Sequence, residues 1–295
     1  MLLGPPWQFW FRRFRVRSEV VETTETGMEV RERSGGFRFW MSKLRSLFFY
    51  DPLVWIYTII LGSVSLISSL FDRGGEIQHR VARLWARVIL RTIGVPVKVV
   101  GMEAIDTSRS HVYVVNHLSA LDVPVLYDSL PFQFRILAKK ELFRYPFMGW
   151  HLKRSGQIPV VLDNPKASIR SLNLAVAAIK SNMPLLVFPE GGRSEDGQLQ
   201  KFMGGAFYAA IKAQTDVVPM ALIGTYETLK MNTWHIKPRP VQLLVGRPIL
   251  TQGLTARDLE RVSDEARRAI AEMYYSHTLL PDLRPESLKE TGRVS

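Results

Sequence analysis

The amino-acid sequence predicts an α/β fold in which a mixed sheet is flanked by helices and preceded by membrane-associated helices. From residue 96 onward, short apolar runs alternate with longer helical stretches, which is the pattern of a sheet covered by helices. Ahead of this region lie an uncharged segment, 52–71, and a basic amphipathic stretch, 76–94. The length of 295 residues allows one large domain or two small ones.

The composition narrows the classes of chemistry and of partner. The formal net charge is +12, which suits an anionic membrane, a phosphorylated substrate or nucleic acid, and also fits a solvated basic surface. Cysteine is absent, which excludes disulfide scaffolds, thiolate nucleophiles and cysteine metal sites and fits a reducing compartment. The six histidines are scattered without an H-E-x-x-H motif, so we expect no metal and no bound cofactor.

Residues 1–45 predict a poorly ordered extension in which aromatic and basic side chains are mixed. No apolar h-region or cleavage site is present, which excludes a secretory signal. The same composition fits an arm that lies on a membrane surface. Met28 and Met41 are alternative starts. The aromatic and basic residues are Trp7, Phe9, Trp10, Phe11 and Phe14 with Arg12, Arg13, Arg15 and Arg17.

Residues 46–94 predict two helices. The segment 52–71 would reach ~30 Å as a helix, the thickness of a bilayer's hydrocarbon core. Its serines and glycine weaken its hydropathy, so it is a marginal spanning helix, a helix dipping into one leaflet, or a buried core helix. The stretch 76–94 has one apolar and one arginine-rich face, typical of an interfacial helix or of an ordinary domain helix. Basic residues flank both ends of 52–71, so charge does not fix an orientation.

Residues 95–280 predict a single α/β domain, followed by a polar tail at 281–295. The helical stretches lie between the strands, and the predicted helices are 122–130, 141–153, 166–181, 200–214 and 255–275. The predicted strands are 97–100, 112–116, 135–138, 157–161, 185–189, 217–223 and 241–245.

The stretch VYVVNHLSALDVP places His117 and Asp122 around a change of chain direction. On a continuous helix, side chains five residues apart point about 140° away from each other. Here a strand ends near Asn116 and a helix begins near Asp122, so the two side chains can meet. Asp122 would orient the imidazole, which would then accept a proton from a hydroxyl. A helix cap beside an unrelated histidine fits the same letters.

A second H-x4-D pair, His277 and Asp282, has no strand before it, and we interpret it as accidental.

Two further stretches place basic residues after strands. In LLVFPEGGRSEDG, paired glycines let backbone N–H groups approach an anion, and Arg193 offers a planar donor fork. In AKKELFRYPFMGW, Lys139 and Lys140 follow a strand. Because ligands bind at the ends of strands in α/β sheets, His117, Lys139 and Arg193 are expected to face one crevice. A solvent turn with surface cations is the alternative.

Together these motifs resemble those of the glycerolipid acyltransferases, most closely the 1-acylglycerol-3-phosphate acyltransferases. NHLSALD is similar to NH-x4-D, AKKELFRYPFMG to the K-x-E-L block, FPEGGRS to FPEGTRS, and VVPMALIG to the apolar-proline motif. The resemblance covers about residues 50–250 and implies a glycerol-3-phosphate acyltransferase-like fold with a catalytic domain at 95–280.

The resemblance also implies roles for individual residues. His117 would be the general base and Asp122 its partner, while Lys139 and Arg193 would bind the substrate phosphate. The acceptor-binding residues would be Glu190, Gly191 and Gly192, and the supporting residues would be Asn116, Ser194 and Pro219. Pro219 equally fits the edge residue of a strand.

The implied reaction moves an acyl group from acyl-CoA or acyl carrier protein, as co-substrate, to the 2-hydroxyl of lysophosphatidic acid, giving phosphatidic acid. Oxyanion donors are expected among the backbone N–H groups near the 117–122 turn. The implied location is the membrane phospholipid surface, with the active site on the cytoplasmic side of a bacterial inner membrane.

Two departures from the family pattern bear on the headgroup: Gly192 stands where threonine is usual, and Asn164 where many relatives have arginine. Acceptors such as glycerol 3-phosphate or another lysophospholipid therefore stay open. A non-catalytic protein that binds anionic lipid would explain the charge and the apolar segment, but not His117, Asp122 and Glu190. A nucleic-acid partner fits only the charge, and no binding module is present, so none is expected.

Overall fold

The computed structural model describes residues 36–72, 74–161 and 165–278. Several predictions fall outside this part of the chain. They are the aromatic and basic arm at 1–35, the departure at Asn164, and the polar tail with Asp282.

A seven-stranded sheet in the order β1-β7-β6-β2-β5-β3-β4 forms the centre of the molecule. Every neighbouring pair is parallel except β6 and β7, which are antiparallel. The predicted α/β fold with a mixed sheet is therefore confirmed. The strands are β1 Val97–Val100, β2 Val112–Val115, β3 Arg135–Lys139, β4 Ile158–Val160, β5 Leu185–Val187, β6 Val217–Ile223 and β7 Val241–Val245.

Helices cover both faces of the sheet, and the side chains of β2 show how the two cores divide. Val112 and Val114 are buried with α6, α7 and α9, whereas Tyr113 and Val115 are buried with α3 and α4. This is the period-two alternation of a strand covered on both sides. The α-helices are α1 Gly36–Arg45, α2 Asp51–Ser68, α3 Glu76–Thr92, α4 Asp122–Ser129, α5 Met148–Arg154, α6 Pro165–Lys180, α7 Gly205–Ala213, α8 Thr225–Thr228 and α9 Leu259–His277.

Prolines move two boundaries away from the prediction. The single helix predicted at 141–153 is a 3₁₀ helix, Lys140–Arg144, followed by α5. Pro146 lies between the two helices and interrupts the predicted one, because proline lacks an N–H and disfavours helical backbone in the residue before it. The strand predicted at 185–189 ends at Val187, two residues before Pro189.

Helix α1, a π-helical stretch (Ser46–Tyr50) and α2 form one long helix on the outside of α3. The prediction that irregular structure continues to residue 45 is wrong for 36–45, which are helical. The long helix is tied to the domain near both ends, where Ser42 Oγ lies 2.9 Å from His235 Nε2 and Ser65 Oγ lies 2.8 Å from His151 Nδ1.

The outer face of this long helix is apolar and exposed. Within the described residues, Phe39–Ser68 is the one helix with the length and composition to cross a membrane, and only 6% of its most apolar window is buried. The alternative of a buried core helix is therefore wrong. Ile59 is 63% exposed and Ile67 is 62% exposed.

Pro219 lies in β6, an interior strand between β7 and β2, so its interpretation as an edge residue is wrong. It is tolerated there because β7 ends at Val245, before reaching it. Gly246, the residue that follows Val245, donates its N–H to the Pro219 carbonyl at 2.8 Å. The missing N–H of the proline therefore lies where the ladder is already interrupted.

Candidate active site

The candidate site lies where three adjacent parallel strands, β2, β5 and β3, end at the same edge of the sheet. Asn116 and His117 follow β2, the loop 188–194 follows β5, and Lys139 is the last residue of β3. The topology therefore brings together the predicted catalytic and phosphate-binding residues, which are far apart in the sequence.

The turn between β2 and α4 joins His117 to Asp122. His117 Nδ1 lies 2.8 Å from Asp122 Oδ2, and the two side chains are 11% and 0% exposed. The same Oδ2 accepts the N–H groups of Leu118 at 2.7 Å and Ser119 at 2.9 Å. Because Oδ2 accepts from both backbone groups, we assign the proton of the short contact to Nδ1. Nε2 is then the ring nitrogen left to accept a proton from a substrate.

These hydrogen bonds change one expectation about the turn. Oxyanion donors were expected among its backbone N–H groups, but those of Leu118 and Ser119 are used by Asp122, and that of His117 is used by Glu190. These three groups are therefore engaged by carboxylates and cannot also stabilise an oxyanion.

Glu190 connects two loops through backbone hydrogen bonds. Its Oε1 accepts the N–H of His117 at 2.9 Å, and its Oε2 accepts the N–H of Gln200 at 2.8 Å. Burial raises the pKa of Glu190 to about 7, against the two backbone hydrogen bonds, which lower it; the nearby charge of Asp122 adds to the increase. A second backbone hydrogen bond joins the same two loops, because Ser194 donates its N–H to the His117 carbonyl at 2.9 Å. Glu190 thus holds the backbone of the histidine in place.

The cationic side of the site is formed by Arg193 and Lys139. Arg193 is buried, and burial lowers its pKa, while the charge of Asp122 acts in the opposite direction. Lys139 is exposed, and its Nζ lies 3.9 Å from the point where a Cβ on Gly192 would be. Gly191 has a φ of 70°, a left-handed conformation that favours glycine. The paired glycines therefore sharpen the turn and keep the space beside the lysine open.

Sequence reasoning missed the role of Phe188, whose ring stacks on that of His117 with centroids 4.0 Å apart. The signal was present, because Phe188 begins the FPEGGRS motif. Asn116 was expected only as a supporting residue, and its side-chain amide bonds to a neighbouring strand as a backbone amide would. Its amide exchanges hydrogen bonds with Leu222 of β6, donating to the carbonyl at 2.9 Å and accepting the N–H at 2.7 Å.

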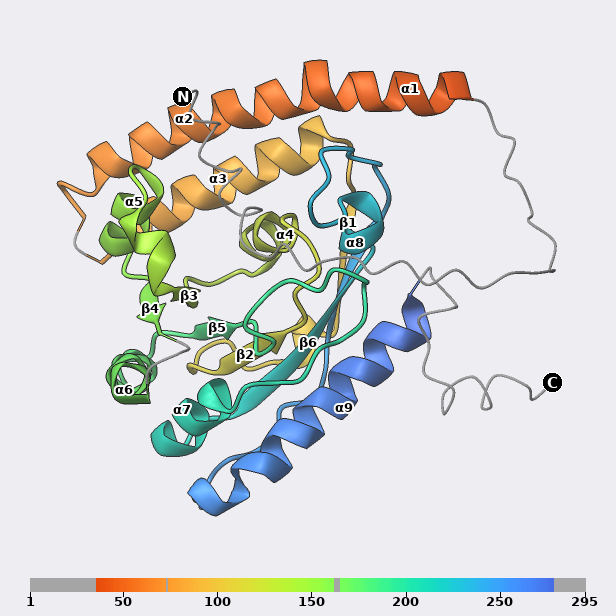
Figure 1. Ribbon diagram of the computed structural model, residues 1–295. Helices are drawn as coiled ribbons and strands as arrows, with labels where there is room; N and C mark the ends of the chain where they lie inside the picture. The colour runs from red at the N-terminus through yellow and green to blue at the C-terminus, as the bar shows by residue number, and fades with distance from the viewer. Residues whose placement is uncertain (1–35, 73, 162–164, 279–295) are drawn as a thin grey trace, which may run out of the picture.

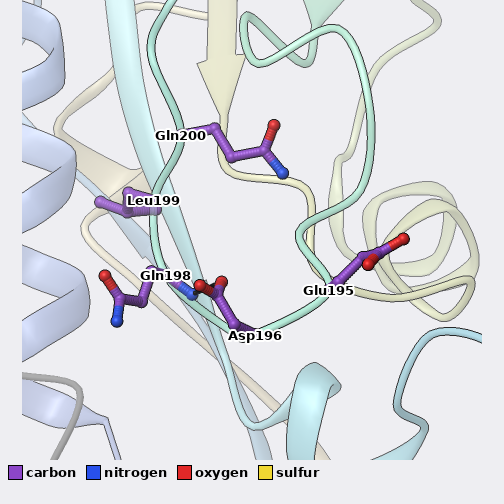
Figure 2. Close-up of a pocket in the computed structure, with 5 residues that line it drawn as sticks. All are labelled: Glu195, Asp196, Gln198, Leu199 and Gln200. Carbon is purple, nitrogen blue, oxygen red and sulfur yellow. Dashed lines mark hydrogen bonds between the residues drawn. The ribbon is translucent and has the colours of Figure 1, made fainter. Parts of the chain in front are cut away.

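Ser194 is buried and its hydroxyl shapes the loop: Oγ donates to Asp196 Oδ1 at 2.8 Å and accepts the N–H of Gly197 at 3.1 Å. The loop then lines an open hollow of about 550 Å³. Figure 2 shows that its lining includes two carboxylates, and the five residues are Glu195, Asp196, Gln198, Leu199 and Gln200. An acidic lining repels phosphate, so this hollow does not suit the anionic end of a substrate.

Two further points from the sequence concern His277 and the possibility of a metal site. His277, of the pair interpreted as accidental, is at the end of α9, where its Nδ1 lies 2.9 Å from the Met273 carbonyl. In the part of the chain that the structure describes, no group of three or more His, Cys, Asp or Glu residues is arranged to hold a metal ion.

Comparisons with known proteins agree with the motifs. An acyltransferase family model matches residues 96–223. The 1-acyl-sn-glycerol-3-phosphate acyltransferase of Cocos nucifera is 31% identical over 204 residues, 69% of this chain and 62% of the coconut protein. The one of Saccharomyces cerevisiae is 30% identical over 220 residues, 72% of each chain. The match therefore spans less than two thirds of the coconut relative's length.

A solved structure shows the same fold. The 1-acyl-sn-glycerophosphate (LPA) acyltransferase PlsC from Thermotoga maritima is 24% identical, with a TM-score of 0.63, and the alignment covers 80% of this chain and 96% of that one. Given the family model and the yeast relative, which is matched over 72% of its length, the chain belongs to the glycerolipid acyltransferase family, alongside proteins named 1-acyl-sn-glycerol-3-phosphate acyltransferase.

Proposed function

We propose that this protein transfers a fatty acyl group from a thioester, acyl-CoA or acyl carrier protein, to the 2-hydroxyl of 1-acyl-sn-glycerol 3-phosphate. The product is phosphatidic acid. The observation that carries the proposal is the buried His117–Asp122 pair, held through backbone hydrogen bonds to the loop that bears Arg193. Relatives that bear the name of this activity support the choice of acceptor.

In the proposed mechanism, Nε2 of His117 takes the proton of the acceptor hydroxyl as its oxygen attacks the thioester carbonyl. Asp122 stabilises the imidazolium that forms, because its charge lies 2.8 Å from Nδ1. When the tetrahedral intermediate collapses, the C–S bond breaks and the imidazolium returns the proton to the leaving thiolate. No enzyme nucleophile is needed, which agrees with the absence of cysteine from the sequence.

Lys139 and Arg193 would bind the acceptor phosphate. Both stand at the edge of the sheet that carries His117, and Arg193 is close enough to Asp122 for the aspartate charge to affect its pKa. A buried guanidinium offers a planar fork to phosphate oxygens, while an exposed ammonium acts as a point charge. Together they would place the headgroup beside the base.

The long helix α1–α2 would hold the enzyme on a membrane. It is docked on the domain near both ends, so its exposed apolar face suits a helix lying within one leaflet better than one spanning the bilayer. The two relatives described above come from a plant and a yeast and the solved structure from a bacterium, so we propose membrane association without assigning it to the bacterial inner membrane.

The test is an acyl-transfer assay with purified full-length protein and a panel of acceptors: lysophosphatidic acid, glycerol 3-phosphate and other lysophospholipids. Each is offered with acyl-CoA and with acyl carrier protein. His117→Ala serves as the blank, and His277→Ala as the matched control, because His277 lies at the end of α9, outside the site. We expect phosphatidic acid from wild type and from His277→Ala, and ~10²–10⁴-fold less from His117→Ala.

Other outcomes would redirect the assignment. Faster turnover of a different acceptor would replace the proposed substrate and keep the reaction. Lipid binding with no release of free thiol from any donor would favour the non-catalytic alternative. Full activity in His117→Ala would overturn the role of the base.

A further inference from the structure

The segment Tyr145–Arg154, which we call the aromatic corner, carries two exposed aromatic side chains that the proposed chemistry does not use. Phe147 is 64% exposed and Trp150 is 53% exposed. Their rings contact each other, with centroids 5.6 Å apart and planes inclined by 54°. Large aromatic side chains are costly to leave in water, so a paired, exposed cluster marks a surface that meets another apolar phase.

The backbone holds this exposed pair in a strained conformation. Phe147 has a φ of 59°, which is unusual for a bulky residue. The turn is fixed by Met148 N–H donating to the Pro146 carbonyl at 2.7 Å and Gly149 N–H donating to the Tyr145 carbonyl at 2.8 Å. A Cβ at Gly149 would lie 2.4 Å from the Phe143 carbonyl oxygen, so only glycine permits this packing. Strain of this kind persists where the surroundings enforce it, and it gathers at functional positions.

Charge around the aromatic corner points to the chemistry of its partner. The stretch 140–154 contains four exposed cations and one carboxylate, Glu141. The cations are Lys140, Arg144, Lys153 and Arg154. Aromatic rings surrounded by lysine and arginine suit the interface of an anionic bilayer, where the rings lie at headgroup level and the cations meet lipid phosphates.

The aromatic corner is continuous with the long N-terminal helix. His151, one turn after Phe147, contacts Ser65 of α2 at 2.8 Å, and α5 lies beside the C-terminal part of α2 (Figure 1). Ile67, in that part of α2, and Phe71, just beyond the end of the helix, are exposed apolar residues. At its other end, the 3₁₀ helix Lys140–Arg144 connects the corner directly to Lys139.

We propose that the aromatic corner is a second membrane-binding element, which inserts Phe147 and Trp150 into the headgroup region of an anionic bilayer. This proposal rests on the membrane association proposed above for α1–α2. Because the aromatic corner lies beside the long helix and not on it, a second contact there would stop the domain from rotating about that helix. The membrane then fixes the height of Lys139, and with it the level at which the site meets a lipid phosphate.

The absence of cysteine from the chain permits a direct test. Full-length single-cysteine variants Trp150→Cys, Ile60→Cys and Leu250→Cys are labelled with an environment-sensitive apolar fluorophore and mixed with phosphatidylglycerol–phosphatidylcholine vesicles. Ile60 lies on α2, and Leu250, 70% exposed, lies beyond β7 and serves as the matched exposed control. We expect a blue shift at positions 150 and 60 and none at 250. A shift at 60 without one at 150 overturns the aromatic corner, whereas no shift at either position overturns membrane association itself.

Partition measurements separate the two components of the aromatic corner. In low salt, Lys153→Gln with Arg154→Gln should weaken binding to anionic vesicles by about fivefold per charge and leave binding to neutral vesicles unchanged. Its control is Lys212→Gln with Arg268→Gln, which removes two exposed cations from α7 and α9 on the other side of the sheet.

Phe147→Asn with Trp150→Ser should weaken binding to both kinds of vesicle by about tenfold, against no change for Leu250→Ser. Equal partition of wild type and this aromatic variant, or a loss of self-association in place of a loss of lipid binding, would refute the proposal.

Discussion

Replacing Asp122 with asparagine tests the electrostatic part of the mechanism while keeping its shape. Oδ2 accepts three hydrogen bonds, from His117 Nδ1 and from the N–H groups of Leu118 and Ser119. Oδ1 is buried and accepts none from the described residues. The amide oxygen of an asparagine should therefore take the Oδ2 position and the NH₂ group the Oδ1 position. The imidazole would keep its tautomer, and only the negative charge would be lost.

The size of the effect follows from that geometry. A carboxylate roughly 4 Å from an imidazolium stabilises it by about 4 kcal/mol at an effective dielectric constant of ~20. Since each 1.36 kcal/mol of barrier is a tenfold change in rate, Asp122→Asn should lower kcat by about 10³-fold. The unfolding free energy should change by less than about 2 kcal/mol, because three hydrogen bonds become neutral while the cost of burying a charge disappears.

The assay is steady-state acyl transfer with the best donor and acceptor, read together with thermal unfolding. Asp128→Asn is the matched control, because Asp128 lies on the same helix and pairs with Arg87 at 2.9 Å at a partly exposed position. That control should keep its activity, since such surface pairs contribute little. If Asp122→Asn retained kcat within tenfold of wild type, the carboxylate would not stabilise the transition state, and the mechanism above would be wrong.

Three further outcomes are expected. Lys139→Ala should raise KM for the acceptor about 10–100-fold, because a charge-assisted hydrogen bond to phosphate is lost. The control is Lys140→Ala, which removes the neighbouring exposed lysine and should change KM less than threefold in the same assay. Gly192→Thr should fold normally, because its Cβ would meet only the lysine Nζ at 3.9 Å, and calorimetry together with acceptor KM shows whether the added hydroxyl tightens binding. Burial raises the pKa of Glu190 to about 7, so ionising it destabilises the folded state as pH rises from 4.5 to 7. The unfolding free energy of wild type minus that of Glu190→Gln, measured in detergent, should fall by up to about 3 kcal/mol over this window and then level off; a flat difference contradicts the burial argument.

Local sequence signals predicted the strands and allowed His117 to meet Asp122, because both depend on neighbours within a few residues. The same letters also fitted a helix cap beside an unrelated histidine, so only the structure decides that the two side chains meet. The contacts that position the site are of another kind. Asn116 bonds to Leu222, 106 residues away, and Glu190 accepts the N–H of His117 across 73 residues. Such contacts depend on strand order, which the periodicity of each segment does not contain. The interior position of Pro219 was missed for the same reason, because it follows from the strand order, and its tolerance there depends on where β7 ends.

The backbone hydrogen bonds between the histidine loop and the arginine loop have a consequence for which isomer of a substrate reacts. Glu190 and Ser194 join these loops, so the protein sets the gap between the proposed proton acceptor and the proposed anion-binding groups. A glycerol phosphate whose phosphate is seated can then offer for attack only the oxygen that lies that many bonds away. The distance between phosphate and hydroxyl in the substrate would then decide the regiochemistry. The wrong positional isomer would be excluded without any side chain having to touch it.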